Sequence, residues 1–374
     1  MNMTRPNTPI RITFLLLAVF GLEHALAQRP NTARAIKSAE GQVRLLLHES
    51  SVAAGGRGDL VSPRSLDGGK LKMVSSRDWT SGFFPGVLWL LYEGTGKEEW
   101  KRAAIEHTVV LEREKNNGDT HDMGFKINNS FGNGLRLAHM PAYQDVLIRA
   151  ATTLAGRFNP IAGVIKSWDN RKEWSYPVII DNMMNLELLF EAWKFSGDSS
   201  FYRVAVSHAR TTMRNHFRSD YSSWHVLDYD TLTGAVTQRS THQGYADGSA
   251  WARGQAWGLY GFTMCFRETG DTAFLRQAEH IASFLLHHPR LPPDGIPYWD
   301  FDVPGLEGEP RDASAAAVMA SALYELSSYS TEKKAYRKAA DQILRSLLRS
   351  YRSPACGNKG FLLIHRTGHV PAKS

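Results

Sequence analysis

Two short stretches place an aspartate among other polar residues just before a predicted helix. One runs Asp119-Thr120-His121-Asp122-Met123-Gly124-Phe125, and the other runs Val178-Ile179-Ile180-Asp181-Asn182. Either aspartate could cap its helix, and a capping carboxylate is stabilised as the anion. An acid that works near neutral pH needs a raised pKa, which a second carboxylate at short range supplies. The sequence therefore predicts that Asp122 and Asp181 lie together.

A third group of polar and aromatic residues lies on or before a helix predicted over residues 249–268. Its members are His225, His242, Gln243, Trp251, Arg253, Gln255 and Trp257. This combination suits a sugar that carries a carboxylate, because a guanidinium grips a carboxylate in a forked geometry and an aromatic ring covers a sugar face. Core packing explains Arg253 poorly, since an unpaired buried guanidinium is costly. We expect core packing to account for one of the two tryptophans.

Other kinds of catalytic site are missing from the sequence. It has no pair of histidines at metal-ligand spacing, no serine or cysteine nucleophile elbow and no glycine-rich phosphate loop. We therefore expect neither a metal nor a cofactor. The two cysteines are far apart, and Cys265, between Met264 and Phe266, is expected to be a buried free thiol. An export signal would nevertheless permit a disulfide between Cys265 and Cys356.

Helical periodicity interrupted by short polar breaks predicts eleven helices. They cover residues 31–49, 82–94, 97–115, 127–138, 142–157, 182–195, 199–217, 249–268, 272–288, 313–328 and 333–351. Helices that are apolar or small on nearly all sides alternate with helices that are charged on one face. This alternation of inner and outer helices predicts an all-α fold, an α/α toroid. Its active site would lie where the inner helices and their preceding loops converge.

One junction between helices occurs three times, at Gly96, Gly197 and Gly270. In each case a helix ends at a glycine able to adopt the left-handed conformation, and an acidic, basic or hydroxyl residue begins the next helix. These junctions predict stacked helical hairpins. Few strands are expected: residues 224–238 form a hairpin around 231–234, and 298–301 are extended.

The first residues have the pattern of an export signal. Arg5 and Arg11 precede an apolar run over residues 12–22, and Ala25-Leu26-Ala27 offers small residues at cleavage spacing. The run is about half of the ~20 residues that a membrane span needs. The sequence therefore predicts a signal peptide over residues 1–27, a single catalytic domain over 28–374 and a periplasmic or secreted location.

The charge balance indicates the kind of ligand. Loss of the signal peptide lowers the formal net charge from +7 to +6, because two arginines and one glutamate are removed. A mild basic excess favours an anionic substrate through long-range attraction. The basic residues are dispersed, which argues against a nucleic-acid surface. The oligomeric state is left open.

Four motifs together resemble the unsaturated glucuronyl hydrolases of glycoside hydrolase family 88. They are Asp78-Trp79-Thr80-Ser81-Gly82-Phe83-Phe84-Pro85-Gly86, HDMGF at 121–125, IIDNMMN at 179–185 and HQGYADGSAWARGQAWGLYG at 242–261. The resemblance runs from about residue 30 to the end, and four motifs in order make it specific. It implies an (α/α)6 barrel that hydrolyses oligosaccharides with a 4,5-unsaturated uronic acid at the non-reducing end. Such oligosaccharides are products of polysaccharide lyases.

The resemblance also implies roles for individual residues. Asp181 matches the general acid/base, which protonates carbon 4 of the enol ether and activates water to attack carbon 5, and Asp122 matches the second carboxylate. Further positions match the lining of the family's sugar pocket: Trp79, His121, His225, His242, Gln243, Arg253 and Trp257. Arg253 or the histidines are expected to hold the uronate carboxylate, and Trp79 and Trp257 to stack on the sugar.

The C-terminus departs from the family pattern. Relatives usually continue after a Thr-Gly-His-x-Pro motif, here 367–371, into a further helix, whereas this chain stops at Ser374. With eleven predicted helices, the ring is expected to lack its last inner helix. Its neighbours would then expose apolar faces unless the signal-proximal segment or a partner chain covers them.

Three other functions can be compared with the sequence. A pectin-derived unsaturated galacturonyl substrate, as in family 105, would keep the fold and the hydration reaction. A catalytically inactive sugar-binding toroid would fit a missing C-terminal helix, although retention of Asp122 and Asp181 argues against it. An isomerase or epimerase would require a paired-histidine base on inner helices, which the sequence does not show.

Overall fold

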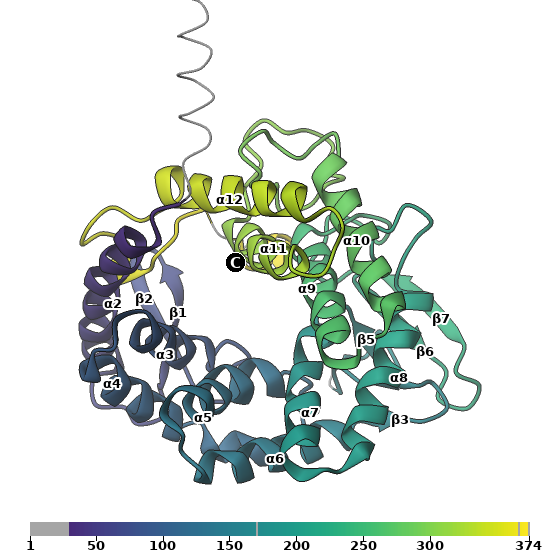
Figure 1. The fold of residues 1–374 in the computed structure, drawn as a ribbon, viewed down its shortest axis with the longest axis horizontal. Coiled ribbons are helices and arrows are strands. Elements are labelled where there is room, and N and C mark those ends of the chain that lie inside the picture. The colour runs from purple at the N-terminus through teal and green to yellow at the C-terminus, as the bar shows by residue number, and fades with distance from the viewer. Residues whose placement is uncertain (1–29, 170, 366, 373–374) are drawn as a thin grey trace, which may run out of the picture. The chain divides into compact units, whose positions relative to one another are not determined.

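Helices that are buried on all sides alternate along the chain with helices that have one polar face. The computed structural model describes residues 30–372, apart from 170 and 366. Within the compact unit that begins at Ala33, one set of helices lies on the inside of a ring and the other set surrounds it (Figure 1). The inner helices are α3 (Phe83–Thr95), a π-helical segment (Gly124–Gly132) continued by α5 (Asn133–Ala138), α7 (Asn182–Ser196), α9 (Ala252–Thr269) and α11 (Ala313–Leu326). The outer helices are α2 (Thr32–Ala54), α4 (Glu98–Val109), α6 (Ala142–Ala155), α8 (Ser199–Asn215), α10 (Thr272–His287) and α12 (Lys333–Ser350).

Each of the eleven predicted helices is present, and the α/α toroid is confirmed. The boundaries differ where tertiary contacts act on a helix end. The helix predicted from residue 249 begins at Ala252, because Trp251 is extended and pairs with Asp300. The helix predicted over 97–115 ends at Val109 and is followed by a 3₁₀ turn, Glu112–Asn116.

The three glycine junctions form as expected. Gly96, Gly197 and Gly270 have φ values of 66°, 73° and 68°, and each donates its N–H back to the preceding helix at 2.8 Å. Asp198 and Asp271 then cap the outgoing helices by accepting backbone N–H groups. These junctions keep the turns short at one end of the ring.

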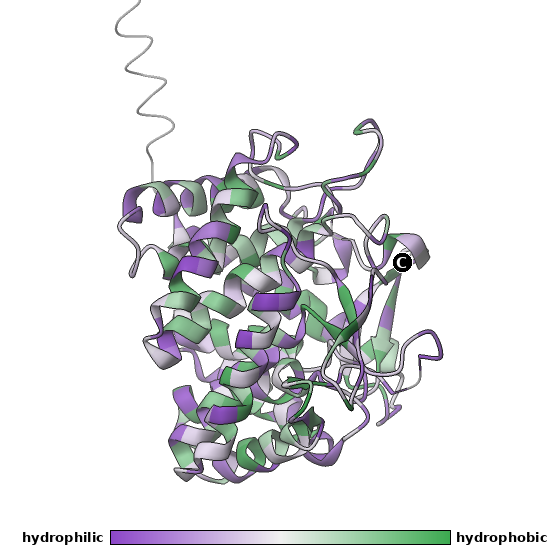
Figure 2. Cartoon of the chain, turned by 90° about the vertical axis from the view of Figure 1, so that its right-hand side faces the viewer, coloured by the Kyte–Doolittle hydropathy of each residue, from purple (hydrophilic) through white to green (hydrophobic). Residues whose placement is uncertain are grey.

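Strands and long loops gather at the opposite end (Figure 2). The predicted hairpin is confirmed as β6 (Val226–Tyr229) and β7 (Val236–Ser240), which β5 (Pro177–Ile179) extends to an antiparallel sheet. The other strands are β1 (Ser62–Asp67) with β2 (Lys70–Val74) and β3 (Phe158–Asn159) with β4 (Val164–Ile165). The segment 298–301 makes only isolated bridges, at Tyr298 and Asp300.

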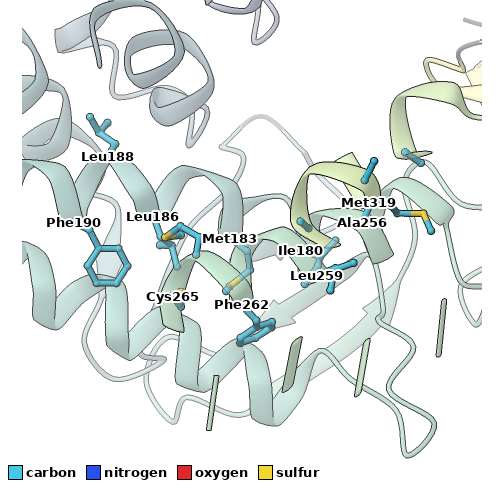
Figure 3. Packing of buried hydrophobic residues seen from close by; sticks show 14 of the residues in the cluster. Ile180, Met183, Leu186, Leu188, Phe190, Ala256, Leu259, Phe262, Cys265 and Met319 are labelled. Carbon is cyan, nitrogen blue, oxygen red and sulfur yellow. The ribbon is translucent and has the colours of Figure 1, made fainter. Parts of the chain in front are cut away.

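The core lies between the inner helices and the helices outside them. Side chains of α7, α9 and α11, including Met183, Phe262 and Met319, pack into one cluster with Ile180, which precedes α7 (Figure 3). Gly261 allows α9 to approach α7 closely, since a Cβ atom there would lie 2.5 Å from Cβ of Met183. Cys265 is fully buried and unpaired, as expected, and Cys356 is also free.

Helix α2 is joined to the C-terminal part of the chain through Gln42. Its side-chain amide donates to the carbonyls of Gly357 and Phe361, both at 3.2 Å, and accepts from the N–H of Cys356 at 2.9 Å. No α-helix follows α12 in the part of the chain described up to Ala372. Instead, the apolar side chains of residues 361–363 pack against the main core beside this junction.

The proposed signal peptide, residues 1–27, lies outside the described residues. In the described part of the chain, no helix combines the length and apolar character needed to cross a bilayer.

Candidate active site

Both predicted aspartates lie at the loop-rich end of the ring, just before inner helices. Asp181 immediately precedes α7, and Asp122 precedes the π-helical segment by two residues. The backbone N–H of Ile180 donates to the carbonyl of His225 at 3.1 Å, next to the paired strands β5 and β6. The sheet therefore fixes Asp181 beside His225.

Asp181 is buried, and its side chain does not cap α7. Its Oδ2 atom has no hydrogen-bond partner among the described residues and lies 3.7 Å from Nε2 of His225. Burial, and to a smaller extent the negative charge of Asp122, raise the pKa of Asp181 to about 7. Arg253 and Trp257 act in the opposite direction, because they stabilise the anion. The raised pKa expected from the sequence is confirmed, but burial contributes more to it than the second carboxylate.

His225 is held in one tautomer. Its Nδ1 atom accepts the backbone N–H groups of His242 at 3.0 Å and Gln243 at 3.1 Å, so the proton of the neutral ring is on Nε2. Burial lowers the pKa of His225 well below its ordinary value, which keeps the ring neutral. His225 therefore presents an N–H donor towards Asp181.

Asp122 lies between a hydroxyl and an imidazole. Thr120 donates its hydroxyl to Oδ2 at 2.8 Å, and Nε2 of His121 is 3.2 Å from Oδ1. The other ring nitrogen of His121 is 2.9 Å from the carbonyl of Ser167, which can only accept. Nδ1 therefore carries the proton of the ring, and burial lowers the pKa of His121, so the Nε2 atom that faces Asp122 has no hydrogen-bond partner among the described residues.

Ser167 connects the segments that carry the two aspartates. Its carbonyl holds His121, and its hydroxyl accepts the N–H of Ile179 at 2.9 Å while donating to Oδ1 of Asn182 at 2.9 Å. A second link comes from Asn185 on α7, whose side-chain oxygen accepts the N–H of Phe125 at 2.9 Å. These bonds fix the π-helical segment against the start of α7.

Arg253 is buried on the first turn of α9 and already has partners. Its Nη1 atom pairs with Asp312 at 2.6 Å and donates to the carbonyl of Thr367 at 2.6 Å, and Nη2 donates to the carbonyl of Gly368 at 2.6 Å. Its guanidinium also lies 4.7 Å from the ring of Trp251. Arg253 thus anchors the C-terminal segment over the site, and a role in holding the uronate carboxylate stays a prediction.

A connected row of aromatic rings forms one wall of the site. Trp79 lies 5.5 Å from Phe125 and 5.8 Å from Phe83, and Phe125 lies 5.4 Å from Trp257. Both Trp251 and Trp257 are buried in one cluster, and the assignment of one of them to core packing alone stays a prediction. Trp251 packs against His225, with ring centres 4.6 Å apart, and Trp257 joins the wall.

Further aromatic and basic residues lie around His242. The ring of His242 is 5.3 Å from Trp168 and 4.4 Å from His369, and its Nε2 atom is 3.1 Å from a guanidinium nitrogen of Arg171. Gln243 donates to the carbonyl of Gly368 at 3.4 Å. The structure thus brings all nine predicted site residues to one end of the ring.

Several neighbours of these residues were missed by sequence reasoning. They are Phe125, Ser167, Trp168, Arg171, Trp174, Asn185 and His369. Asn185 and Phe125 stood inside motifs already singled out, so their spacing offered a signal. Trp168, Arg171 and Trp174 lie in a loop with no periodicity, and only the fold brings that loop to His242.

Four buried polar atoms around the site have no hydrogen-bond partner among the described residues. They are Nε2 of His121, Oδ2 of Asp181, Nε2 of His225 and Nε1 of Trp257. Buried polar groups are normally paired, because an unpaired one loses its hydration without compensation. A cluster of unpaired donors and acceptors beside an aromatic wall is typical of a polar ligand site.

Comparisons with known proteins point to one group of enzymes. No family model matches the chain. An unsaturated glucuronyl hydrolase of Formosa agariphila is 51% identical over 301 residues, which cover 80% of this chain and 75% of that protein. An unsaturated chondroitin disaccharide hydrolase of Streptococcus agalactiae is 34% identical over 75% of this chain and 72% of its own length.

A solved structure gives the same result for the fold. A crystal structure of an unsaturated glucuronyl hydrolase specific for heparin superposes with a TM-score of 0.86 at 45% sequence identity, covering 91% of each chain.

Proposed function

The chain belongs to the unsaturated glucuronyl hydrolases, and we propose that it hydrolyses oligosaccharides whose non-reducing end is a 4,5-unsaturated glucuronic acid. The observation that carries this proposal is the pair formed by Asp181, with its pKa raised to about 7, and the neutral N–H of His225 facing it. A carboxyl that keeps its proton near neutral pH can give that proton to carbon.

The reaction is a hydration. Asp181 donates its proton to carbon 4 of the enol ether, which leaves an oxocarbenium ion shared by carbon 5 and the ring oxygen. The resulting carboxylate takes a proton from a water molecule as the water oxygen bonds to carbon 5. The hemiketal so formed opens by breaking the bond between carbon 5 and the ring oxygen, and the hemiacetal left at carbon 1 releases the partner sugar. One water is consumed, and Asp181 is returned in its protonated form.

The residues around Asp181 assist different steps of this reaction. Asp122 keeps Asp181 protonated by like-charge repulsion, and the Nε2–H of His225 stabilises the carboxylate that forms after proton transfer. The rings of Trp79 and Trp257 offer the face against which the unsaturated sugar stacks. No carboxylate needs to attack carbon 1, so the carboxylate spacing of ordinary glycosidases does not apply.

The test uses residues 28–374 and unsaturated disaccharides released by polysaccharide lyases. We expect the ultraviolet absorbance of the conjugated double bond to disappear while the partner sugar is released in equal amount. A saturated disaccharide of the same two sugars should remain intact. Equal cleavage of the saturated compound would contradict the proposal and indicate an ordinary glycosidase.

In the galacturonyl alternative, the uronic acid differs from glucuronic acid only in the configuration at carbon 4. This difference is lost when the lyase forms the double bond at carbon 4. The alternative is therefore tested by the linkage and identity of the partner sugar in the same assay. An inactive sugar-binding toroid would bind the disaccharides without any loss of absorbance.

We extend the proposal to the location of the protein. The motif at residues 1–27 supports export, with cleavage before Gln28. Expression of the full chain in a Gram-negative host with N-terminal sequencing of the periplasmic protein should give Gln28 as the first residue.

A further inference from the structure

In the loop before α9, consecutive backbone N–H groups donate to side chains. The donors are residues 241–246, which belong to no helix or strand. Thr241 donates to Oδ1 of Asp247 at 2.9 Å, His242 and Gln243 to Nδ1 of His225 at 3.0 and 3.1 Å, Gly244 to Oγ1 of Thr241 at 2.7 Å, Tyr245 to Oδ2 of Asp300 at 2.9 Å, and Ala246 to Oγ of Ser249 at 3.1 Å. The side-chain acceptors therefore set the conformation of this loop.

Asp300 is the fully buried carboxylate among these acceptors. Its Oδ2 atom accepts the N–H of Tyr245 at 2.9 Å and the hydroxyl of Ser249 at 2.7 Å, and its Oδ1 atom accepts the N–H of Asp302 at 2.9 Å. Gly244 lies directly against the same group, since a Cβ atom there would be 3.1 Å from Oδ2 of Asp300. The loop is thus both bonded to and packed on this carboxylate.

The segment that carries Asp300 is fixed to the start of α9. Two backbone hydrogen bonds join them, from Ala252 to the carbonyl of Trp299 at 3.0 Å and from Phe301 to the carbonyl of Ala250 at 3.1 Å. Trp251 lies between these bonds and packs on the ring of His225, with ring centres 4.6 Å apart. Asp300 therefore ties the loop 241–249 to a fixed frame beside His225.

The first part of this loop decides which nitrogen of His225 carries the proton. The N–H groups of residues 242 and 243 both point at Nδ1, which leaves the proton on Nε2. If these donors moved away, Nδ1 could take the proton, and the lone pair of Nε2 would face Asp181 at 3.7 Å. A lone pair there does not stabilise the carboxylate that proton transfer leaves on Asp181.

We propose that Asp300 is a positioning residue for the reaction. It holds the loop 241–249 so that two N–H groups stay on Nδ1 of His225, and it thereby keeps the Nε2–H of His225 towards Asp181. Asp300 acts through the loop, because its own hydrogen bonds go to residues 245, 249 and 302. This inference rests on the proposed function.

The experiment is ¹⁵N NMR spectroscopy of the substrate-free protein labelled with ¹⁵N-histidine, because a ring nitrogen that carries a proton and one that carries a lone pair differ widely in shift. The signals of His225 are assigned from their absence in His225→Gln. For the unaltered protein we expect a protonated Nε2 and an unprotonated Nδ1.

Asp300→Asn should change both this spectrum and the rate. An amide has one acceptor oxygen in place of two, so at least one of the three donors to Asp300 loses its partner. We expect the shifts of the two ring nitrogens of His225 to approach each other as both tautomers become populated. On an unsaturated disaccharide, kcat should fall by about ten- to a hundredfold, the usual effect of losing a hydrogen bond to a charged group.

A second variant, Ser249→Ala, keeps the test valid if Asp300→Asn does not fold. It removes only the hydroxyl that joins Ala246 to Asp300, and it should give smaller changes of the same kind in the spectrum and in kcat. The matched control is Asp230→Asn. Asp230 also accepts two backbone N–H groups, of Leu232 and Thr233 at 2.7 and 2.9 Å, but in the turn between β6 and β7, and its replacement should leave both readings unchanged.

A His225 spectrum that stays unchanged in Asp300→Asn and Ser249→Ala would overturn the inference. A loss of kcat without any change of tautomer would overturn it as well and give Asp300 a purely structural role. Both results leave the hydrolysis itself standing. Absence of turnover by the unaltered protein is a separate result, because the spectra are recorded without substrate, and it would overturn the proposed function together with the role of Asp300 in the reaction.

Discussion

Burial and the negative charge of Asp122 both raise the pKa of Asp181. The carboxyl is removed from water at the start of an inner helix, and Asp122 adds like-charge repulsion. His225 faces it with an N–H fixed by two backbone donors on the other ring nitrogen. The site therefore holds a protonated acid and also a donor ready for the anion that proton transfer produces.

The first prediction concerns the pH dependence of the reaction. Because Asp181 must be protonated, kcat/KM should fall as pH rises above about 7. In Asp122→Asn the negative charge that disfavours the Asp181 anion is removed, so the pKa of Asp181 falls. The alkaline limb of the kcat/KM profile should then move to lower pH.

The matched control for this prediction is Asp119→Asn. Asp119 lies in the same loop, but its side chain is 78% exposed and paired with Arg77. Its replacement should leave the limb in place. An alkaline limb that stays put or moves to higher pH in Asp122→Asn would contradict the account.

The second prediction concerns stability. The pKa of Asp181 is about 7 in the folded protein against 3.8 as its ordinary value, so between these pH values the folded state holds a proton that the unfolded state has lost. Stability contributed by this group therefore falls as pH rises through that window, by on the order of 4 kcal/mol at most.

Asp181→Asn removes the loss of stability that deprotonation of Asp181 causes in the folded protein. The urea midpoint of the variant should exceed that of the unaltered protein at pH 8, and the difference should shrink towards zero near pH 4. A variant that is less stable at pH 8 would show that the Asp181 anion is well accommodated in the fold.

The residue types of the site could be predicted from the sequence, but their tautomers and hydrogen-bond partners could not. Two aspartates before inner helices could be paired on the basis of sequence, because helix order placed them at the same end. The tautomer of His225 depends on the N–H groups of His242 and Gln243, and the pairing of Arg253 depends on Asp312 and the C-terminal segment. Such contacts between distant parts of the chain leave no local pattern.

Among the elements, the π-helical segment Gly124–Gly132 determines where Asp122 lies relative to α7. Helices of this type are rare in proteins as a whole, and those that occur are frequently found at functional sites. Gly124 touches α7 directly: a Cβ atom there would lie 2.7 Å from Cα of Asn185. The glycine of the HDMGF motif is thus required for the close approach of the two acid-bearing segments.

Gly124→Ala should therefore reduce both stability and activity. Overpacking against backbone costs about 1–3 kcal/mol, and separation of the two segments should lower kcat more than tenfold. Chemical denaturation and steady-state kinetics measure the two effects. Gly118→Ala is the control, since a Cβ atom at that position of the same loop meets nothing within 4 Å. Equal behaviour of the two variants would remove the role assigned to Gly124.

The helices could be predicted from the sequence because their signals are local. Apolar periodicity and the glycines at 96, 197 and 270 predicted eleven helices, whose boundaries differ little from those in the structure. Strand β5, by contrast, has three residues, and its pairing with β6 spans a long stretch of chain. The loop that carries Arg171 has no regular pattern, so its approach to His242 could not be predicted.

At the scale of the whole molecule, the ring is joined where α2 meets the segment after α12. Gln42 makes three hydrogen bonds across this junction and is almost fully buried. Gln42→Ala leaves the N–H of Cys356 unpaired and should destabilise the fold by about 1–3 kcal/mol, as measured by chemical denaturation. Gln144→Ala, which loses a single 3.5 Å contact with Phe195, should have little effect. A similar small effect for both variants would show that Gln42 does not secure the junction.

The same ring brings separate parts of the sequence to one pocket, and the proposed reaction depends on that convergence. Its central claim is that Asp181 delivers a proton to carbon 4. The most direct measurement is the proton NMR spectrum of the product formed in D₂O from an unsaturated disaccharide. The account predicts one deuteron at carbon 4 of a product that has lost its double bond, and no product from Asp181→Asn. Release of a uronic acid that keeps its double bond and carries no deuterium at carbon 4 would contradict it.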